Sequence, residues 1–246
     1  MTGDERSSTR IGWAKRIFLG VLVIAGIALF VSLGIWQLHR LAWKLDLIRI
    51  VDERLAAEPV DAPGPSSWPE LSAANDAYRR VRISGHFTDA PPAFVQAVTQ
   101  LGPGFWVVEP FQTDRGFVVL INRGFVTKVE AEHLPVAPSD DLAVTGLLRI
   151  TEPGGAFLRS NDPVGDRWYS RDVAAIAKAR GLEGAAPYFV DADASATSAE
   201  PPVGGLTVVN FRNHHLVYAL TWFGLAVMLA GWTIYLLRFR READRK

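Results

Sequence analysis

Two long apolar runs lie near the ends of the chain, and neither contains a formally charged residue. The first run covers residues 17–38 and the second covers residues 216–237. At 1.5 Å per residue each run gives a helix of roughly 33 Å, against a hydrocarbon core of about 30 Å. A cleaved signal peptide has a shorter apolar core and a small-residue cleavage site, which the WQLHRLAWK segment after the first run lacks. We therefore predict two retained transmembrane helices.

Between these runs the pattern predicts a helical stalk and then a β-rich domain. Apolar residues recur at helical spacing over residues 39–57, so this segment continues the first helix. Short alternating or apolar segments separated by turn residues follow in residues 58–209. The expected strands are residues 78–87, 94–98, 105–111, 117–122, 142–150, 188–191 and 206–209. The predicted fold is an α+β membrane protein in which two transmembrane helices flank a small antiparallel β-barrel or sandwich with one or two helices.

Three local patterns in this domain make the prediction more specific. Asp114–Gly116 has the composition of a hairpin turn between two of the strands. Residues 168–182 change to helical period, with Ser170 as the expected N-cap and Gly181 at the end. Asn122–Gly124, which reads NRG, follows a strand, and we interpret it as a turn rather than a phosphate-binding loop.

Charge sets the expected orientation in the membrane. Residues 1–38 hold four basic and two acidic residues, net +2, and residues 238–246 hold five basic and two acidic, net +3. Because short basic tails stay on the cytoplasmic side, tails 1–16 and 238–246 should both be cytoplasmic. Residues 39–215 would then lie in the periplasm of a bacterial inner membrane, with residues 210–237 forming an interfacial segment and the second span.

Small residues predict that the two spans pack together in the lipid. Glycine and alanine let helix backbones approach closely, and both runs contain them. The candidates are Gly20, Gly26 and Gly34 on the first span and Gly224, Ala230 and Gly231 on the second.

Composition excludes several classes of site. The chain contains no cysteine and only two methionines, which rules out disulfides, cysteine-ligated zinc and a methionine-rich copper site. The segment between the spans is acidic, unlike the basic surface of a nucleic-acid binder, so no nucleic-acid partner is expected. No common hydrolase or metalloprotease motif is present. We expect no enzymatic activity and no catalytic residues.

One helix face at the start of the second span has the composition of a haem site. His215, Tyr218, Ala219 and Trp222 share a face at helical spacing. An imidazole is a common axial ligand of haem iron, and two flat aromatic rings with a small residue between them suit a porphyrin. Arg40, Lys44 or Arg212 would pair with the propionates. Histidine, tyrosine and tryptophan are also ordinary residues of membrane interfaces, so this pattern alone leaves both interpretations open.

Five segments in order make the chain resemble the Surfeit locus protein one family of cytochrome oxidase assembly factors. They are GIWQLHRLAWK at residues 34–44, GFVVLINRGFV at 116–126, WYSRDVAAIAKARGL at 168–182, APYFVDAD at 186–193 and PVGGLTVVNFRNHHLVYALTWFGLA at 202–226. The family's histidine falls on His215, and its first-span motif falls on Gly34, Trp36, Gln37 and Arg40. The sequence departs from the family at Phe125–Thr127, where many members have Trp-Val-Pro.

The resemblance implies a role in building haem–copper oxidases, at the step where haem a enters the catalytic subunit. The implied haem ligand is His215, near Trp36, Gln37 and Arg40 of the first span. From helical spacing, our hypothesis adds Tyr218 and Trp222 as contacts of the haem ring. The implied partners are the catalytic subunit of cytochrome c oxidase, haem a synthase and membrane lipid. The haem would lie between the outer halves of the two helices. The alternative is a membrane-anchored scaffold that stabilises an oxidase intermediate and binds no cofactor.

Overall fold

The computed structural model describes residues 4–137, 140–156, 158–194, 201–206 and 213–243. The chain divides into two compact units. The first consists of residues 1–49 and 211–246 and contains a pair of long helices. The second, residues 50–210, contains a β-barrel domain.

Helix α1 (Asp4–Ala56) is continuous through the predicted tail, the first apolar run and the stalk. No proline occurs before Pro59, so nothing in the sequence interrupts the backbone hydrogen bonds of this helix. The residues preceding the first apolar run are therefore helical from Asp4 onward, where the sequence indicated only a polar tail. Near the other end of α1, the Arg54 guanidinium donates to the carbonyls of Ala74 and Ala77 at 2.6 and 2.9 Å.

Helix α5 (His215–Ala243) contains the second apolar run. Just before this helix, the Asn213 side-chain oxygen accepts a hydrogen bond from the backbone N–H of His215 at 3.3 Å. The segments Trp13–Ala56 and His215–Phe239 are long and apolar enough to cross a membrane. Most of their apolar side chains are exposed within the chain itself, which suits contact with lipid rather than water.

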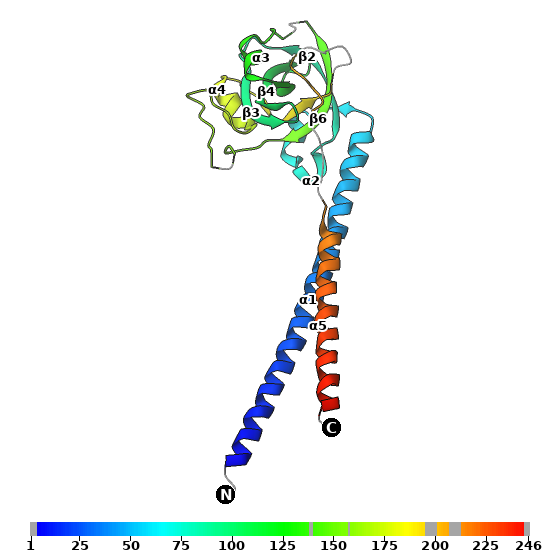
Figure 1. Cartoon of the computed structure of the whole chain (residues 1–246). Helices are drawn as coiled ribbons and strands as arrows, with labels where there is room; N and C mark the ends of the chain where they lie inside the picture. Colours follow the sequence, from blue (N-terminus) through cyan, green and yellow to red (C-terminus); the bar gives the residue numbers. More distant parts are fainter. Residues whose placement is uncertain (1–3, 138–139, 157, 195–200, 207–212, 244–246) are drawn as a thin grey trace. The chain divides into compact units, whose positions relative to one another are not determined.

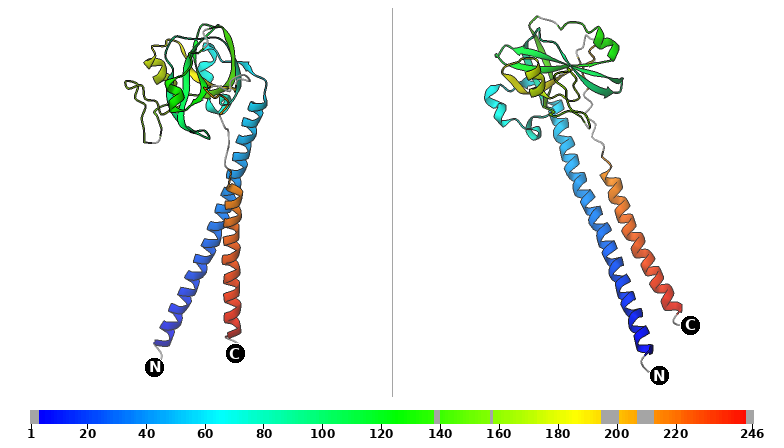
Figure 2. Two further views of the ribbon diagram at one scale, coloured as in Figure 1. Left: turned by 45° about the horizontal axis from the view of Figure 1, so that its top comes forward. Right: turned by 90° about the vertical axis from the view of Figure 1, so that its left-hand side faces the viewer.

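The two helices of the first unit run side by side and antiparallel (Figures 1 and 2). The chain direction reverses between them, so the beginning of α1 and the end of α5 lie at the same end of the pair. This arrangement is the one that the two-span prediction requires of its helices.

The second unit is a closed barrel with two added edge strands. Five strands form the ring in the order β2-β6-β7-β5-β4, and β4 pairs back onto β2 to close it. The ring strands are β2 (Arg80–Phe87), β4 (Gly102–Thr113), β5 (Val118–Val126), β6 (Leu142–Ile150) and β7 (Ala185–Ala192). Strands β1 (Val60–Asp61) and β3 (Ala93–Thr99) pair at the edges of β2 and β4.

Short helical segments connect these strands. They are the 3-10 helix η1 (Pro65–Glu70) and the α-helices α2 (Ala73–Asp76), α3 (Lys128–Glu132) and α4 (Val173–Ala179). The barrel encloses a core of β-branched and aromatic side chains that includes Val81, Phe111, Val119, Ile121 and Tyr188. A second cluster around Trp168 and Phe189 lies under α4.

The barrel prediction is confirmed, but its strands are not all antiparallel. Strands β5 and β7 pair in parallel. A ring with an odd number of strands cannot alternate direction at every step, so a five-stranded ring must contain at least one parallel pair. The hairpin of β4 and β5 is confirmed, with Gln112 opposite Val118 and Gly116 in the left-handed region at φ 81°.

Two local predictions in this domain are wrong. The N-cap of α4 is Asp172, whose carboxylate accepts from the Ala175 N–H, and Ser170 instead accepts hydrogen bonds from Gly155 and Asn161. The NRG segment is not a turn, because residues 122–124 lie inside β5 next to a register shift in its pairing with β4. Of the strand predicted at residues 206–209, residues 207–209 lie outside the described part of the chain.

Candidate functional site

The contact between α1 and α5 is a tight seam of small and aromatic residues. Gly34 lies against the Phe223 ring, so that a Cβ there would be 2.6 Å from a ring carbon. A Cβ on Gly26 would come within 3.2 Å of a Leu229 methyl group. Ala219 is buried at the seam with 1% exposure. The helices thus pack directly against each other, as small residues in membrane helices permit.

The structure confirms only part of the predicted glycine contact. Gly26 and Gly34 do face α5, whereas Gly20, Gly224 and Gly231 have no neighbouring heavy atom within 4 Å of a built Cβ. Ala230 is half-buried on α5. The seam on α5 is instead formed largely by Ala219, Phe223 and Ala226.

His215 and Gln37 meet across this seam. The Nδ1 atom of the His215 ring lies 2.7 Å from the Oε1 atom of the Gln37 side chain, a short hydrogen bond. Gln37 is 9% exposed, and His215 is half-buried. Gln37 and His215, which the resemblance assigns to one site, are 178 positions apart in the chain and form a direct hydrogen bond.

Helical spacing indicates that the remaining predicted site residues share one side of the helix pair. Arg40 follows Gln37 by three residues, and Tyr218 follows His215 by three. A local two-fold axis relates the two helices of an antiparallel pair. Gln37 and His215 face each other, so the residues three positions after each of them point to the same side of the pair. Trp36 lies one turn before Arg40, and Trp222 lies one turn after Tyr218. We call the surface formed by Trp36, Arg40, Tyr218 and Trp222 the aromatic face.

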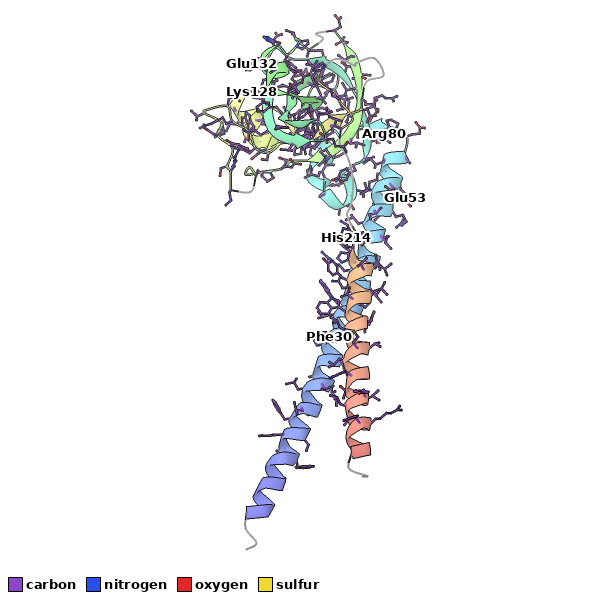
Figure 3. All side chains as sticks on the ribbon, viewed as in Figure 1. Phe30, Glu53, Arg80, Lys128, Glu132 and His214 are labelled. Carbon is purple, nitrogen blue, oxygen red and sulfur yellow. The ribbon has the colours of Figure 1, made fainter. Side chains whose placement is uncertain are left out.

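The side chains of this face differ in their surroundings. Trp36 and Tyr218 are 55% and 56% exposed. Trp222 stacks on the Phe30 ring of α1, with centroids 5.8 Å apart and planes 27° apart; Phe30 is labelled in Figure 3. The Arg40 guanidinium lies over the Trp43 ring at 4.2 Å from its centroid. The face therefore combines exposed aromatic surface with one cation near its end.

The seam between the helices is closely packed at several positions. Ala219, the small residue between Tyr218 and Trp222 in the sequence pattern, is buried there. Gly26 and Gly34 also make close contacts across the seam. The exposed surface beside His215 is therefore the aromatic face.

Sequence reasoning missed three aromatic residues that shape this region: Phe30, Trp43 and Phe223. Phe30 lies seven residues before Gln37, two helical turns along the same face, so helical spacing would have indicated it. Trp43 follows Arg40 by three residues and lies within reach for the same reason. Phe223 was not predictable, because its role depends on which glycine of α1 it meets. Arg212, a predicted propionate partner, lies outside the described residues.

The donor set is chemically suited to haem. His215 offers an imidazole nitrogen, and its other ring nitrogen has a hydrogen-bonded partner, as metal-ligating histidines usually do. The aromatic face supplies apolar ring contact, and Arg40 supplies a charge-complementary group for a carboxylate. Among the described residues, no group of three or more histidine, cysteine, aspartate or glutamate side chains is placed to hold a metal ion.

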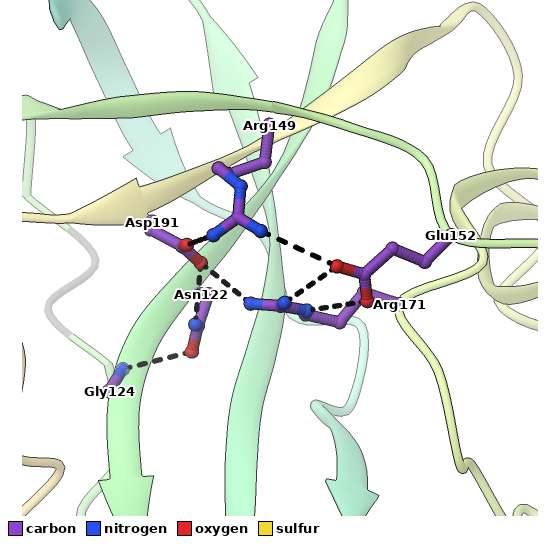
Figure 4. A network of polar contacts seen from close by, with 6 residues as sticks. All are labelled: Asn122, Gly124, Arg149, Glu152, Arg171 and Asp191. Atoms are coloured by element: carbon purple, nitrogen blue, oxygen red, sulfur yellow. Dashed lines mark hydrogen bonds and ion pairs between the residues drawn. The ribbon is translucent and has the colours of Figure 1, made fainter. Parts of the chain in front are cut away.

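The barrel contains a separate polar network, which accounts for the NRG segment (Figure 4). Asp191, 3% exposed, accepts hydrogen bonds from Asn122, Arg149 and Arg171 at 2.7, 2.6 and 3.1 Å. Glu152 pairs with Arg171 at 2.7 Å and with Arg149 at 3.6 Å. The Asn122 side-chain oxygen also accepts from the Gly124 N–H. Two guanidinium groups thus face two carboxylates, which indicates a structural rather than a ligand-binding role.

Known proteins match this chain over most of its length. The sequence pattern of the SURF1 family matches residues 24–227. Surfeit locus protein 1 from Mus musculus is 37% identical over 213 residues, covering 79% of this chain and 67% of the relative. The protein of the same name from Homo sapiens is 35% identical over 226 residues, covering 84% and 73%. A SURF1-like protein from Caenorhabditis elegans is 29% identical over 263 residues, covering 97% and 78%. The chain therefore belongs to the SURF1 family.

Proposed function

We propose that this chain is an assembly factor for haem–copper cytochrome c oxidase that binds haem a on the aromatic face and delivers it to the catalytic subunit. Membership of the SURF1 family supports the process. One observation carries the site: His215, bonded to Gln37, lies at the seam beside a face to which both helices contribute aromatic side chains.

Each residue of the face has a role in this proposal. His215 ligates the iron through its free ring nitrogen, Nε2. Trp36, Tyr218 and Trp222 contact the porphyrin ring, whose apolar surface matches theirs. Arg40 pairs with a propionate through its guanidinium, a geometry suited to carboxylates. The haem is the cargo of the protein and supplies the redox centre of the completed oxidase.

A single histidine ligand on an open face suits delivery better than storage. A carrier must capture haem and then release it, and a closed site with two ligands would oppose release. The face is open on its outer side, because Trp36 and Tyr218 keep more than half of their surface exposed. The oxidase subunit would thus reach the haem without the helices having to separate.

We assign the two spans to a bacterial inner membrane with both ends of the chain in the cytoplasm. The basic residues beyond each span support this orientation through the positive-inside rule. The barrel domain then lies in the periplasm, and His215 lies at the periplasmic end of its span. Haem a synthase would supply the cargo at that surface.

Cells that lack this chain test the function. We expect their oxidase subunit to be made but to contain much less haem a than the subunit from complemented cells. Haem a per subunit, measured by pyridine haemochrome after purification, is the readout. Restoration by the unaltered chain but not by His215→Ala would support haem delivery.

The scaffold function predicts a different pattern in the same experiment. The subunit itself would fail to accumulate, the purified chain would be colourless, and His215→Ala would restore assembly fully. That combination would contradict haem delivery and would support a cofactor-free scaffold.

A further inference from the structure

The hydrogen bond between Gln37 and His215 determines which nitrogen of the histidine carries a proton. The Gln37 atom in the bond is the amide oxygen Oε1, which can only accept. With the Gln37 amide oriented in this way, Nδ1 of His215 is the donor and carries the hydrogen. In a neutral ring the lone pair is then on Nε2.

We infer that Gln37 is a positioning residue that holds His215 in the Nδ1-protonated tautomer and so leaves Nε2 as the nitrogen that ligates iron. The part of this inference that concerns iron rests on the proposed function. The tautomer itself does not, because it is a property of the haem-free protein.

The surroundings of Gln37 make its geometry well defined. Gln37 lies on the buried face of α1, one turn after Gly34, and Gly34 packs against Phe223. One turn after His215, Ala219 is buried at the same seam. Because the helices are antiparallel, both contacts lie on the same side of the hydrogen bond, where they fix the register of the two helices. Because Gln37 is only 9% exposed, water has less access to this bond than it would have to a bond in solution.

The same geometry predicts what happens when the partner is removed. Loss of an outer partner of a metal-ligating histidine typically lowers metal affinity about 10–100-fold. Without Gln37 the imidazole is free to rotate and to place its proton on Nε2, which blocks that nitrogen as a ligand. Binding should therefore weaken although the ligand itself is still present.

Histidine NMR on the full-length haem-free chain in detergent micelles tests the tautomer directly. The chain contains five histidines, and comparison with His215→Ala assigns the signal of interest. In the unaltered chain we expect the Nδ1 signal of His215 to be of the protonated type and the Nε2 signal to be of the unprotonated type. In Gln37→Met, which keeps the length of the side chain but removes the amide oxygen, the Nε2-protonated form should appear. A protonated Nε2 in the unaltered chain would overturn the inference.

Haem titration of the same variants tests the consequence for iron. Gln37→Met should bind haem about 10–100-fold more weakly than the unaltered chain. Gln37→Glu provides an acceptor again, so it should recover binding and lower the reduction potential of the bound haem, because a carboxylate makes the imidazole more basic. Equal affinity and equal potential in all three proteins would overturn the positioning role.

The two readouts separate this inference from the proposed function. A chain that shows the predicted tautomer and its loss in Gln37→Met, but binds no haem, would contradict the proposed function and leave the positioning of His215 intact. A chain that binds haem through His215 with unchanged spectra in Gln37→Met would support the function and contradict the inference.

Discussion

Asp191 shows how single residues of the barrel depend on distant partners. It accepts from Asn122, 69 positions earlier, and from Arg149 and Arg171, 42 and 20 positions earlier. The sequence presented NRG as a turn because its local composition is that of a turn. Asp191 is the long-range partner of Asn122 because β5, β6 and β7 pair in the barrel, and local sequence patterns do not encode that pairing.

Asp191→Asn should strongly destabilise the barrel domain. The substitution leaves the guanidinium groups of Arg149 and Arg171 with one buried carboxylate fewer, and removing one partner of a buried ion pair typically costs about 3–5 kcal/mol. Urea unfolding of the full chain in detergent, followed by tryptophan fluorescence, measures the loss. Asp193→Asn is the matched control: Asp193 pairs with Arg80 but is 39% exposed, so it should lose at most about 1 kcal/mol. Equal losses would contradict a buried network centred on Asp191.

Glu109 gives the barrel a pH dependence of known sign. Its side chain is 8% exposed, and burial raises the pKa of its carboxyl group above the usual value, although the Arg123 guanidinium 3.0 Å away opposes this. An acid whose pKa is higher in the folded state binds more protons there, so its contribution to stability falls as the pH rises from its unfolded pKa through its folded pKa. We expect the unfolding free energy of the unaltered chain to fall, relative to that of Glu109→Gln, as the pH rises from about 4. Urea unfolding at a series of pH values measures both free energies. A rise in the stability of the unaltered chain relative to Glu109→Gln would contradict the assignment.

At the scale of elements, the sequence predicted the helices and strands better than their contacts. The boundaries of β6 match the prediction, and the hairpin of β4 and β5 forms around the predicted turn. Period and turn composition are local signals, so they are readable. Which glycines meet the other helix depends on the register of α1 against α5, which the packing of Gly34 on Phe223 and of Gly26 on Leu229 shows.

Gly34→Val should separate the helix pair. A Cβ at this position would lie 2.6–2.9 Å from three atoms of the Phe223 ring, and overpacking of this kind typically costs about 1–3 kcal/mol. The midpoint of thermal unfolding in detergent, followed by circular dichroism, should fall by several degrees. Gly224→Val is the control, because it makes the same change on α5 where no heavy atom lies within 4 Å. Equal shifts for both variants would contradict the packing of Gly34 on Phe223.

At the scale of the whole molecule, the fold class was readable and the closure of the barrel was not. Short strands separated by turns predicted a small barrel or sandwich, and the ring of five strands confirms a barrel. The parallel pair of β5 and β7 follows from closing a ring with an odd number of strands. No local sequence pattern indicates how many strands form the ring, so the expectation of a fully antiparallel barrel was wrong for the β5–β7 pair. Helical spacing and the resemblance indicated the residues of the candidate site, and the structure brings two of them, His215 and Gln37, into contact.

The proposed orientation predicts which parts of the chain face the periplasm. Because the chain has no cysteine, a single introduced cysteine can be labelled without background. A membrane-impermeant maleimide added to intact spheroplasts should label Val164→Cys, since Val164 is 99% exposed on the barrel domain. Lys15→Cys should react only after the cells are opened. Labelling of both variants in intact spheroplasts, or of Lys15→Cys alone, would contradict the orientation.

The central claim is that His215 holds haem on the aromatic face, and the absorption spectrum of the purified full chain tests it most directly. The protein is co-expressed with haem a synthesis and purified in detergent as the unaltered chain, as His215→Ala and as His214→Ala. His214 is the adjacent, exposed histidine and serves as the matched control. We predict a Soret band of similar intensity in the unaltered chain and His214→Ala, and a loss of at least about tenfold in His215→Ala. A band of full intensity in His215→Ala would contradict the account.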